Sequence, residues 1–303
     1  MALPIYASPL ERLWHYVYLV LCGLIFFFLI APILVIIPLS FNAEPYFTFT
    51  QKMLTFDPEG YSTRWYENLL TFGMLEPGAA RDGNWWSDVW QNAAWVKAAK
   101  NSVIIGFFST ILATSLGTLA ALGLSRPEMP YQKAIMAILI SPMIVPIIIT
   151  ATGLFFFYSA TGLANSYLGV VLAHATLGIP FVIITVTATL SGFDRSLLRA
   201  SANLGAGPVR TFFKVQLPLI TPGVVSGALF AFVTSFDEVV VVLFIGSHEQ
   251  QTIPRQMWNG IREQISPSIL AVATLLVIIS IALLTTVELL RRRSERLRGM
   301  SPT

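Results

Sequence analysis

The chain alternates between long apolar segments and short polar ones. A helix that crosses a bilayer needs about 20 predominantly apolar residues, and six segments reach this length. They cover residues 13–40, 103–124, 134–158, 167–190, 222–246 and 269–290. Hydrocarbon offers no partners to backbone polar groups, which only helices and closed barrels satisfy internally. The pattern therefore predicts an all-α integral membrane protein with six transmembrane helices.

The first apolar segment is expected to be a retained helix. Its apolar core is much longer than the roughly 7–15 residues of a signal peptide, and no small-residue cleavage site follows it. We expect residues 1–97 to hold this helix and an extracytoplasmic loop region. Residues 98–292 then form a core of five helices, and residues 293–303 form a cytoplasmic tail.

Composition narrows the function classes. Charged residues make up 12% of the 303 residues, against roughly 25% in soluble domains. The net charge of +3 is too small to indicate nucleic acid as a partner, whereas the chain must meet membrane lipid. The single cysteine, Cys22, excludes an intrachain disulfide.

Basic residues collect in the short loops on one side of the predicted spans. Examples are Arg126, Lys133, Arg195 and the run 291–293. Because cytoplasmic loops carry an excess of Lys and Arg, this asymmetry predicts a multi-pass protein with both termini in the cytoplasm.

The segment 41–102, on the other side, is rich in tryptophan. It contains Trp65, Trp85, Trp86, Trp90 and Trp95. Tryptophan favours the membrane–water interface, so short helices lying against the outer leaflet are one interpretation. A docking platform for an external partner is the other.

Prolines and glycines mark special positions within the spans. Pro142 and Pro146 free backbone carbonyls in the third span and are expected to bend it. Gly223 and Gly227 form a small-xxx-small pair that would allow close helix approach in the fifth span.

The cytoplasmic connection between the fourth and fifth spans, about residues 194–218, does not look like a simple loop. Asp194 is a good N-cap, and Gly205 is a good left-handed helix stop. Pro208 suits the first position of a second helix, and Pro218 is expected to end it. The pattern predicts two short helices at an angle.

This connection is also too apolar for a solvated loop. The apolar side chains are Leu197, Leu198, Leu204, Phe212 and Phe213. An exposed apolar surface of this kind indicates that another protein packs on it.

The same residues resemble a known motif. The spacing Arg199-Ala200-Ser201, Gly205, Val215 and Leu217-Pro218 resembles the EAA loop of permeases in binding-protein-dependent ABC importers. Further stretches resemble the polyamine-type branch: Tyr61 to Tyr66, Asn101-Ser102, His174 to Phe181, and Ser235-Phe236-Asp237-Glu238-Val239. The resemblance covers the chain apart from about 25 residues around 73–96.

The resemblance implies the type I ABC importer permease fold in a bacterial inner membrane, with an extracytoplasmic loop insertion after the first helix. It also implies the partners: a second homologous permease, two ATPase subunits that bind ATP and Mg, and an extracytoplasmic solute-binding protein. The EAA-type loop would lie in a groove of the ATPase. The implied solute is a small cationic amine such as spermidine or putrescine, with an opine, 4-aminobutyrate or a phosphonate as alternatives.

Two loop positions depart from the family pattern. Arg199 stands where Glu is usual, and Ser201 stands where Ala is usual. Like charges brought together at an interface are costly, so the reversal implies a matching change in the ATPase or a contact that tolerates either sign.

Three ionisable residues within the predicted spans are candidates for function. Asp237 and Glu238 fall near the middle of the fifth, where a charge costs roughly 2.5–3.5 kcal/mol. We expect them to line the pathway of a cationic solute, with an interhelical polar clamp as the alternative. His174 is a further pathway candidate, although a lone intramembrane His is more often a hydrogen-bonded packing residue.

Other chemistries lack their motifs. The sequence contains no G-x-x-x-x-G-K-[ST] phosphate loop and no His/Cys metal cluster, so we expect a transport subunit without its own cofactor and not an enzyme. An ion-coupled carrier that uses Asp237 and Glu238 and a purely structural membrane subunit are the competing hypotheses.

Overall fold

The computed structural model describes residues 8–126, 128–263 and 266–297. These residues form helices joined by loops, with one isolated antiparallel bridge between Asn42 and Tyr61. The long helices are α1 (Pro9–Leu39), α5 (Ala94–Leu124), α6 (Gln132–Ile144), α7 (Ile147–Thr161), α8 (Tyr167–Ser191), α11 (Leu217–Phe236), α13 (Ile253–Glu263) and α14 (Ser268–Leu297). The short ones are α2 (Gln51–Leu54), η1 (Pro58–Gly60), α3 (Arg64–Thr71), α4 (Gly83–Asn92), α9 (Ser196–Asn203), α10 (Pro208–Thr211), η2 (Phe212–Gln216) and α12 (Val240–Ile245). The tail residues 298–303 lie outside the described part.

The helices fall into two compact units. One holds residues 1–72 and 260–303, and the other holds residues 73–259. The last helix, α14, groups by contact with α1 and α3. The predicted division into residues 1–97, 98–292 and 293–303 follows chain order and stays a prediction.

Among the described residues, four helices are each long and apolar enough to cross a membrane: α1, α5, α8 and the continuous stretch Pro208–Phe236. The predicted third span is a bent pair, α6 and α7, which meet at 100°. The apolar part of α14, Ser268–Leu283, is shorter. The sixfold count therefore stays a prediction.

The bend between α6 and α7 has a local cause. Val145 has φ −69° and ψ 134°, which is extended backbone, and it directly precedes Pro146. The proline ring clashes with a helical conformation of the preceding residue, so α6 stops here. Pro142 lies inside α6 without ending it. The predicted bend is confirmed, and Pro146 is its cause.

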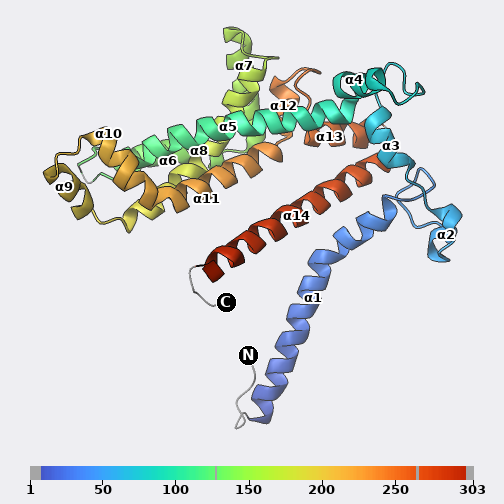
Figure 1. The fold of residues 1–303 in the computed structure, drawn as a ribbon, viewed down its shortest axis with the longest axis horizontal. Helices are drawn as coiled ribbons and strands as arrows, with labels where there is room; N and C mark the ends of the chain where they lie inside the picture. Colours follow the sequence, from blue (N-terminus) through green and yellow to red (C-terminus); the bar gives the residue numbers. More distant parts are fainter. Residues whose placement is uncertain (1–7, 127, 264–265, 298–303) are drawn as a thin grey trace. The chain divides into compact units, whose positions relative to one another are not determined.

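The core of the larger unit is formed by α5, α8 and α11, which run side by side (Figure 1). Small residues let them approach closely. A Cβ added at Gly227 would lie 2.6 Å from Thr185 Oγ1 and 2.8 Å from Val182 Cα, and one at Gly117 would lie 2.7 Å from Val182 Cβ. The predicted small-xxx-small packing is thus confirmed against α8, and Gly117 adds a second contact from α5.

The smaller unit is organised around Asn42, directly after α1. Its Nδ2 donates to the carbonyls of Tyr46 and Thr48, and its own backbone carbonyl accepts from the Trp65 indole at 2.7 Å. On α3, the Asn68 side chain accepts a hydrogen bond at 2.8 Å from the Ser268 hydroxyl, at the start of α14. These bonds tie the loop after α1 to α3, and α3 to α14.

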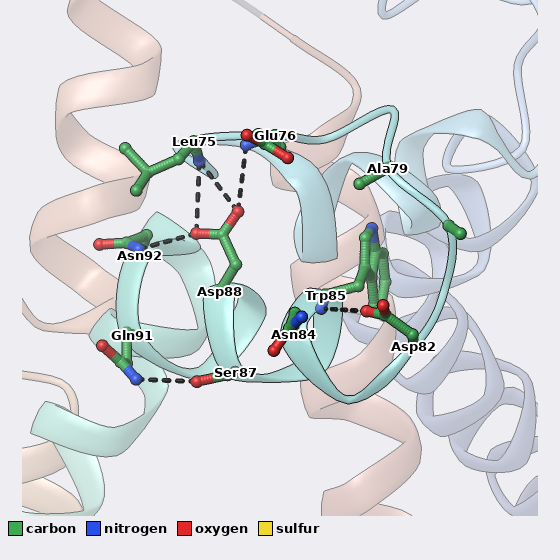
Figure 2. Close-up of a pocket in the computed structure, with 11 residues that line it drawn as sticks. Leu75, Glu76, Ala79, Asp82, Asn84, Trp85, Ser87, Asp88, Gln91 and Asn92 are labelled. Atoms are coloured by element: carbon green, nitrogen blue, oxygen red, sulfur yellow. Dashed lines mark hydrogen bonds between the residues drawn. The ribbon is translucent and has the colours of Figure 1, made fainter.

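The segment 73–96, predicted to be an insertion, folds around α4. Figure 2 shows Asp88 of α4 accepting hydrogen bonds from the backbone N–H groups of Leu75 and Glu76 and from the Asn92 side chain. Asp82 caps α4 by accepting from the Trp85 N–H at 2.9 Å. The two carboxylates hold the segment folded back on itself around a cavity of about 400 Å³.

We predict that Gly227→Ala destabilises the α8–α11 contact. The added Cβ meets backbone, which cannot rotate away, so the expected cost is about 1–3 kcal/mol. Thermal unfolding of the detergent-solubilised protein measures it. The matched control is Gly153→Ala on α7, where an added Cβ meets nothing within 4 Å. Equal melting temperatures for the two variants would show that the close contact is not required.

Candidate functional site

The segment 194–218, called the elbow below, connects α8 to α11. It begins with Asp194, whose carboxylate accepts from the Ser196 hydroxyl at 2.7 Å and from the Ser196 N–H at 2.8 Å. These bonds lower the pKa of Asp194 below its usual range. Helix α9 has Arg195 at its formal N-cap position, so Asp194 caps it from one residue farther out than predicted.

Helix α9 ends as predicted at Gly205. This residue has φ +78°, in the left-handed region. The Gly205 N–H bonds the Ala202 carbonyl, and the Ala206 N–H bonds the Ser201 carbonyl, which is the Schellman pattern of a helix end. Helix α10 then begins with Pro208 at its first position. The chain reverses at this point because glycine adopts positive φ without strain.

Ser201 has a direct role at this turn. It is buried, and its hydroxyl lies 2.8 Å from the Thr211 hydroxyl on α10. An alanine, the usual residue at this position of the motif, could not make this bond. The substitution therefore adds a polar link between the two short helices.

The predicted helix end at Pro218 is wrong. Leu217 is helical, with φ −58° and ψ −46°, and the chain runs as one helix from Pro208 to Phe236. The reason is the π-helical turn η2, in which the Leu217 N–H reaches back to the Phe212 carbonyl. A π turn shifts the hydrogen-bond register by one residue and accommodates a proline that lacks an N–H.

The elbow presents apolar side chains to its surroundings. Leu204 is 89% exposed and Val209 is 71% exposed, and Phe213 is also exposed. Val209 and Phe213 line a shallow groove with Arg210 and Lys214.

Positive charge surrounds these apolar side chains. The exposed Arg199 adds a third basic group to Arg210 and Lys214. The carboxylate of Asp194, at the start of the elbow, accepts a hydrogen bond from the Ser196 hydroxyl. The surface is an apolar centre with a cationic rim.

The elbow is also bound to the end of α5. The Arg195 guanidinium donates to the Ser125 carbonyl at the C-terminus of α5. A positive group is favourable there because the last carbonyls of a helix lack partners within it. The elbow is therefore held by both α8 and α5.

At the opposite end of α11, the helix breaks. Asp237 to Val239 are not helical, and α12 starts at Val240. Asp237 and Glu238 therefore lie in a break, which corrects the prediction of adjacent residues within one continuous helix. Glu238 caps α12 by accepting from the Val241 N–H at 2.9 Å. Asp237 is exposed, and no hydrogen bond to its carboxylate is found among the described residues.

A buried polar cluster lies beside this break. His174 Nδ1 of α8 is 2.8 Å from the Ser235 hydroxyl of α11, and Ser109 of α5 donates to Ser235 at 2.9 Å. His174 is 1% exposed, so it faces helix neighbours. The cluster fixes the last turn of α11 to the two other core helices. Sequence reasoning identified His174 but missed Ser109 and Ser235 as its partners, because their spacing carries no periodic signal.

A second polar cluster lies near the start of α5. Asn101 donates to the carbonyls of Glu249 and Gln251 and accepts from the Tyr167 hydroxyl at 2.9 Å. Ser102 accepts from the Ile253 N–H at 2.8 Å. Asn101 and Ser102 both lie inside α5, which starts earlier than the predicted span. They hold the segment after α12 to α5.

These features lie along one helix. A single helical stretch connects the exposed elbow at one end to Asp237 and Glu238 at the other. The elbow exposes apolar side chains, and the break exposes a carboxylate within a predicted span.

Comparison with known proteins identifies the same architecture. Residues 113–298 match the family described as binding-protein-dependent transport system inner membrane component. In fold, the chain is similar to one from a bacterial ABC transporter involved in the import of the acidic polysaccharide alginate, with a TM-score of 0.68 at 16% identity over 94% of this chain and 99% of that one. A chain of the MetNI methionine ABC transporter has a TM-score of 0.51 at 19% identity, over 63% and 91%.

Curated relatives resemble the chain over most of its length. The spermidine/putrescine transport system permease protein PotC of Haemophilus influenzae is 30% identical over 271 residues, which are 89% of this chain and 95% of the relative. The putrescine transport system permease protein PotI of Escherichia coli K12 is 28% identical over 281 residues, 90% of this chain and 88% of the relative. The chain therefore belongs to the family of binding-protein-dependent transport system inner membrane components, and it is a permease subunit of an ABC importer.

Proposed function

We propose that the chain pairs with a second, homologous permease and moves a small cationic amine, such as spermidine or putrescine, across the inner membrane. An extracytoplasmic solute-binding protein delivers the solute, and two ATPase subunits that bind ATP and Mg supply the energy. The protein crosses the membrane six times with both termini in the cytoplasm, and residues 73–96 form an extracytoplasmic insertion. The observation that carries the proposal is the exposed elbow joined by one helix to an acidic break.

The elbow is the contact to the ATPase. Arg199, Ala200 and Ser201 belong to α9, and Gly205 turns the chain so that Leu204 stands out from the protein. The motif continues toward the base of α11 with Val215, Leu217 and Pro218. Because the rim of the elbow is cationic, the groove of the ATPase that receives it should carry carboxylates. This differs from the groove expected in relatives that have the usual glutamate at the position of Arg199.

Movement of the ATPase reaches the membrane through the stretch Pro208–Phe236. A helix transmits displacement along its axis because its backbone hydrogen bonds hold it as one body. The Ser201–Thr211 bond couples α9 to this stretch at the cytoplasmic end. At the other end, the Ser109–Ser235–His174 cluster couples it to α5 and α8. We assign His174 to packing on this basis, and not to the pathway.

Asp237 is the pathway residue, and Glu238 supports it. A cation that leaves water needs a fixed negative charge to offset its desolvation. The exposed Asp237 can provide this charge, whereas Glu238 orients α12 through the Val241 N–H. The fold itself does not select the sign of the solute, since a similar chain comes from an importer of an acidic polysaccharide. The polyamine relatives and these acids together favour a cationic amine over an opine, 4-aminobutyrate or a phosphonate.

We predict that Gly205→Val lowers transport roughly tenfold or more, because a residue with a Cβ pays about 1–2 kcal/mol in the left-handed region and a β-branched one pays most. Gly205→Asn is the matched control, since asparagine tolerates this conformation and an added side chain meets open space there. Uptake into vesicles that contain the complete transporter measures both. Equal loss in the two variants would mean that the space at residue 205 matters, and not its backbone conformation.

We predict that Leu204→Asp weakens capture of the ATPase about tenfold or more, as expected for a central apolar anchor. Leu75→Asp is the control, because Leu75 is similarly exposed but lies in the insertion. Arg199→Glu should also weaken capture, with Arg199→Gln intermediate and the difference shrinking at high salt. Co-purification of the ATPase in detergent reports the result. Unchanged capture by both Leu204→Asp and Arg199→Glu would refute the docking assignment.

We predict that Asp237→Asn lowers spermidine uptake by roughly tenfold, since the fixed charge that offsets desolvation is lost. Glu238→Gln should have a smaller effect, because the amide oxygen can still accept from Val241. The double variant should be worse than either, with ATPase assembly intact. Near-normal uptake of the cation in the double variant would make these acids structural and would favour a neutral or zwitterionic solute.

A further inference from the structure

Two exposed tryptophans lie four residues apart on α4, in the insertion. Trp86 is 55% exposed and Trp90 is 60% exposed, whereas Trp85 and Val89 of the same helix are buried. Residues four apart lie on the same face of a helix, so Trp86 and Trp90 form one aromatic stripe beside the buried face. An exposed aromatic pair of this kind marks a candidate contact surface.

Lys100 connects this stripe to α5. Its ammonium donates to the Trp90 carbonyl at 2.8 Å and lies 4.6 Å from the centre of the Trp90 ring. Only Ala93 separates α4 from α5. The position of Trp90 relative to α5 is therefore set by a hydrogen bond, a cation–π contact and a one-residue connection.

The stripe continues into the apolar surface of a membrane-spanning helix. Val103, Ile104 and Phe107 are exposed on α5, and they follow Lys100 at intervals of three, four and seven residues. They therefore share its face of the helix. Along this face, exposed hydrocarbon side chains are followed by a lysine and then by two tryptophans. This order is the one that side chains adopt from the acyl region of a bilayer to its headgroups.

We infer that α4 lies on the bilayer surface, with Trp86 and Trp90 in the headgroup region of the outer leaflet. The occupant of the aromatic stripe is lipid, because the stripe meets the apolar face of a span at Lys100, and lysine and tryptophan are the residue types that border a span at the headgroup level. The choice of the outer leaflet rests on the proposed function, in which both termini lie in the cytoplasm. The contact of α4 with lipid does not depend on that orientation.

The neighbouring face of α4 supports this orientation. Ser87 and Gln91 are exposed there, and the Gln91 amide donates to the Ser87 hydroxyl at 2.9 Å. Each follows a tryptophan of the stripe by one residue, which turns its side chain about 100° around the helix axis. The helix thus offers a polar face to water beside an aromatic face for lipid.

The test is a depth measurement on the complete transporter in vesicles of phosphatidylethanolamine and phosphatidylglycerol. In a Cys22→Ser background, a nitroxide is attached at one of four positions: Trp86→Cys, Trp90→Cys, Ser87→Cys or Gln91→Cys. Accessibility is then compared between oxygen, which concentrates in lipid, and a water-soluble nickel chelate. We expect the oxygen-to-nickel ratio at positions 86 and 90 to exceed that at 87 and 91 several-fold.

Two outcomes would overturn the inference. Equal access of the nickel chelate to all four positions would place α4 in water. Shielding of positions 86 and 90 from both reagents would mean that a protein covers the stripe.

Because replacing a tryptophan can itself detach α4, quenching by brominated phospholipids is measured as well. The native protein is compared with a Trp86→Phe, Trp90→Phe double variant. If Trp86 and Trp90 contact lipid, brominated lipid should quench less tryptophan fluorescence in the double variant than in the native protein. Equal quenching in the two proteins would contradict the inference. None of these outcomes depends on ATPase docking or on the solute.

Discussion

The close approach of α8 and α11 is the interaction on which the rest of the structure depends. In hydrocarbon, helices gain little from burying apolar side chains against each other, so contact between backbones and good packing must hold them. Gly223 and Gly227 remove the side chains that would separate these helices, and Gly117 does the same for α5 against α8. The three helices then form a body in which the hydroxyl groups of Ser109 and Ser235 can reach each other and the imidazole of α8.

The packing of α5, α8 and α11 also bears on the proposed coupling at the elbow. With α11 held by these contacts, a displacement of the elbow would move α11 as a whole. The π turn at Phe212–Gln216 bears on the same proposal, because the helical stretch continues through Pro218 and joins the elbow to α11. A functional helix is a common setting for such a turn.

The two acids at the far end of α11 illustrate how a helix break divides similar residues between roles. In a continuous helix, Asp237 and Glu238 would differ only in direction. In the break, Glu238 accepts from a free N–H group at the start of α12, where a negative charge is favourable, and Asp237 keeps an exposed carboxylate. The break thus leaves one carboxylate bound to the backbone and the other exposed.

Much of the architecture could be predicted from the sequence, because the bilayer imposes length and apolarity on every span, and because Gly205 and Pro208 act through their own backbone preferences. Other features depended on partners elsewhere in the chain. Val145 and Leu217 both precede a proline, yet only Val145 leaves the helical conformation, since the π turn accommodates Pro218. Likewise, Ser201 looked like a departure from a motif until Thr211 was found beside it. Local conformational rules determined where helices begin and turn, whereas tertiary contacts decided which breaks occurred and which polar groups found partners.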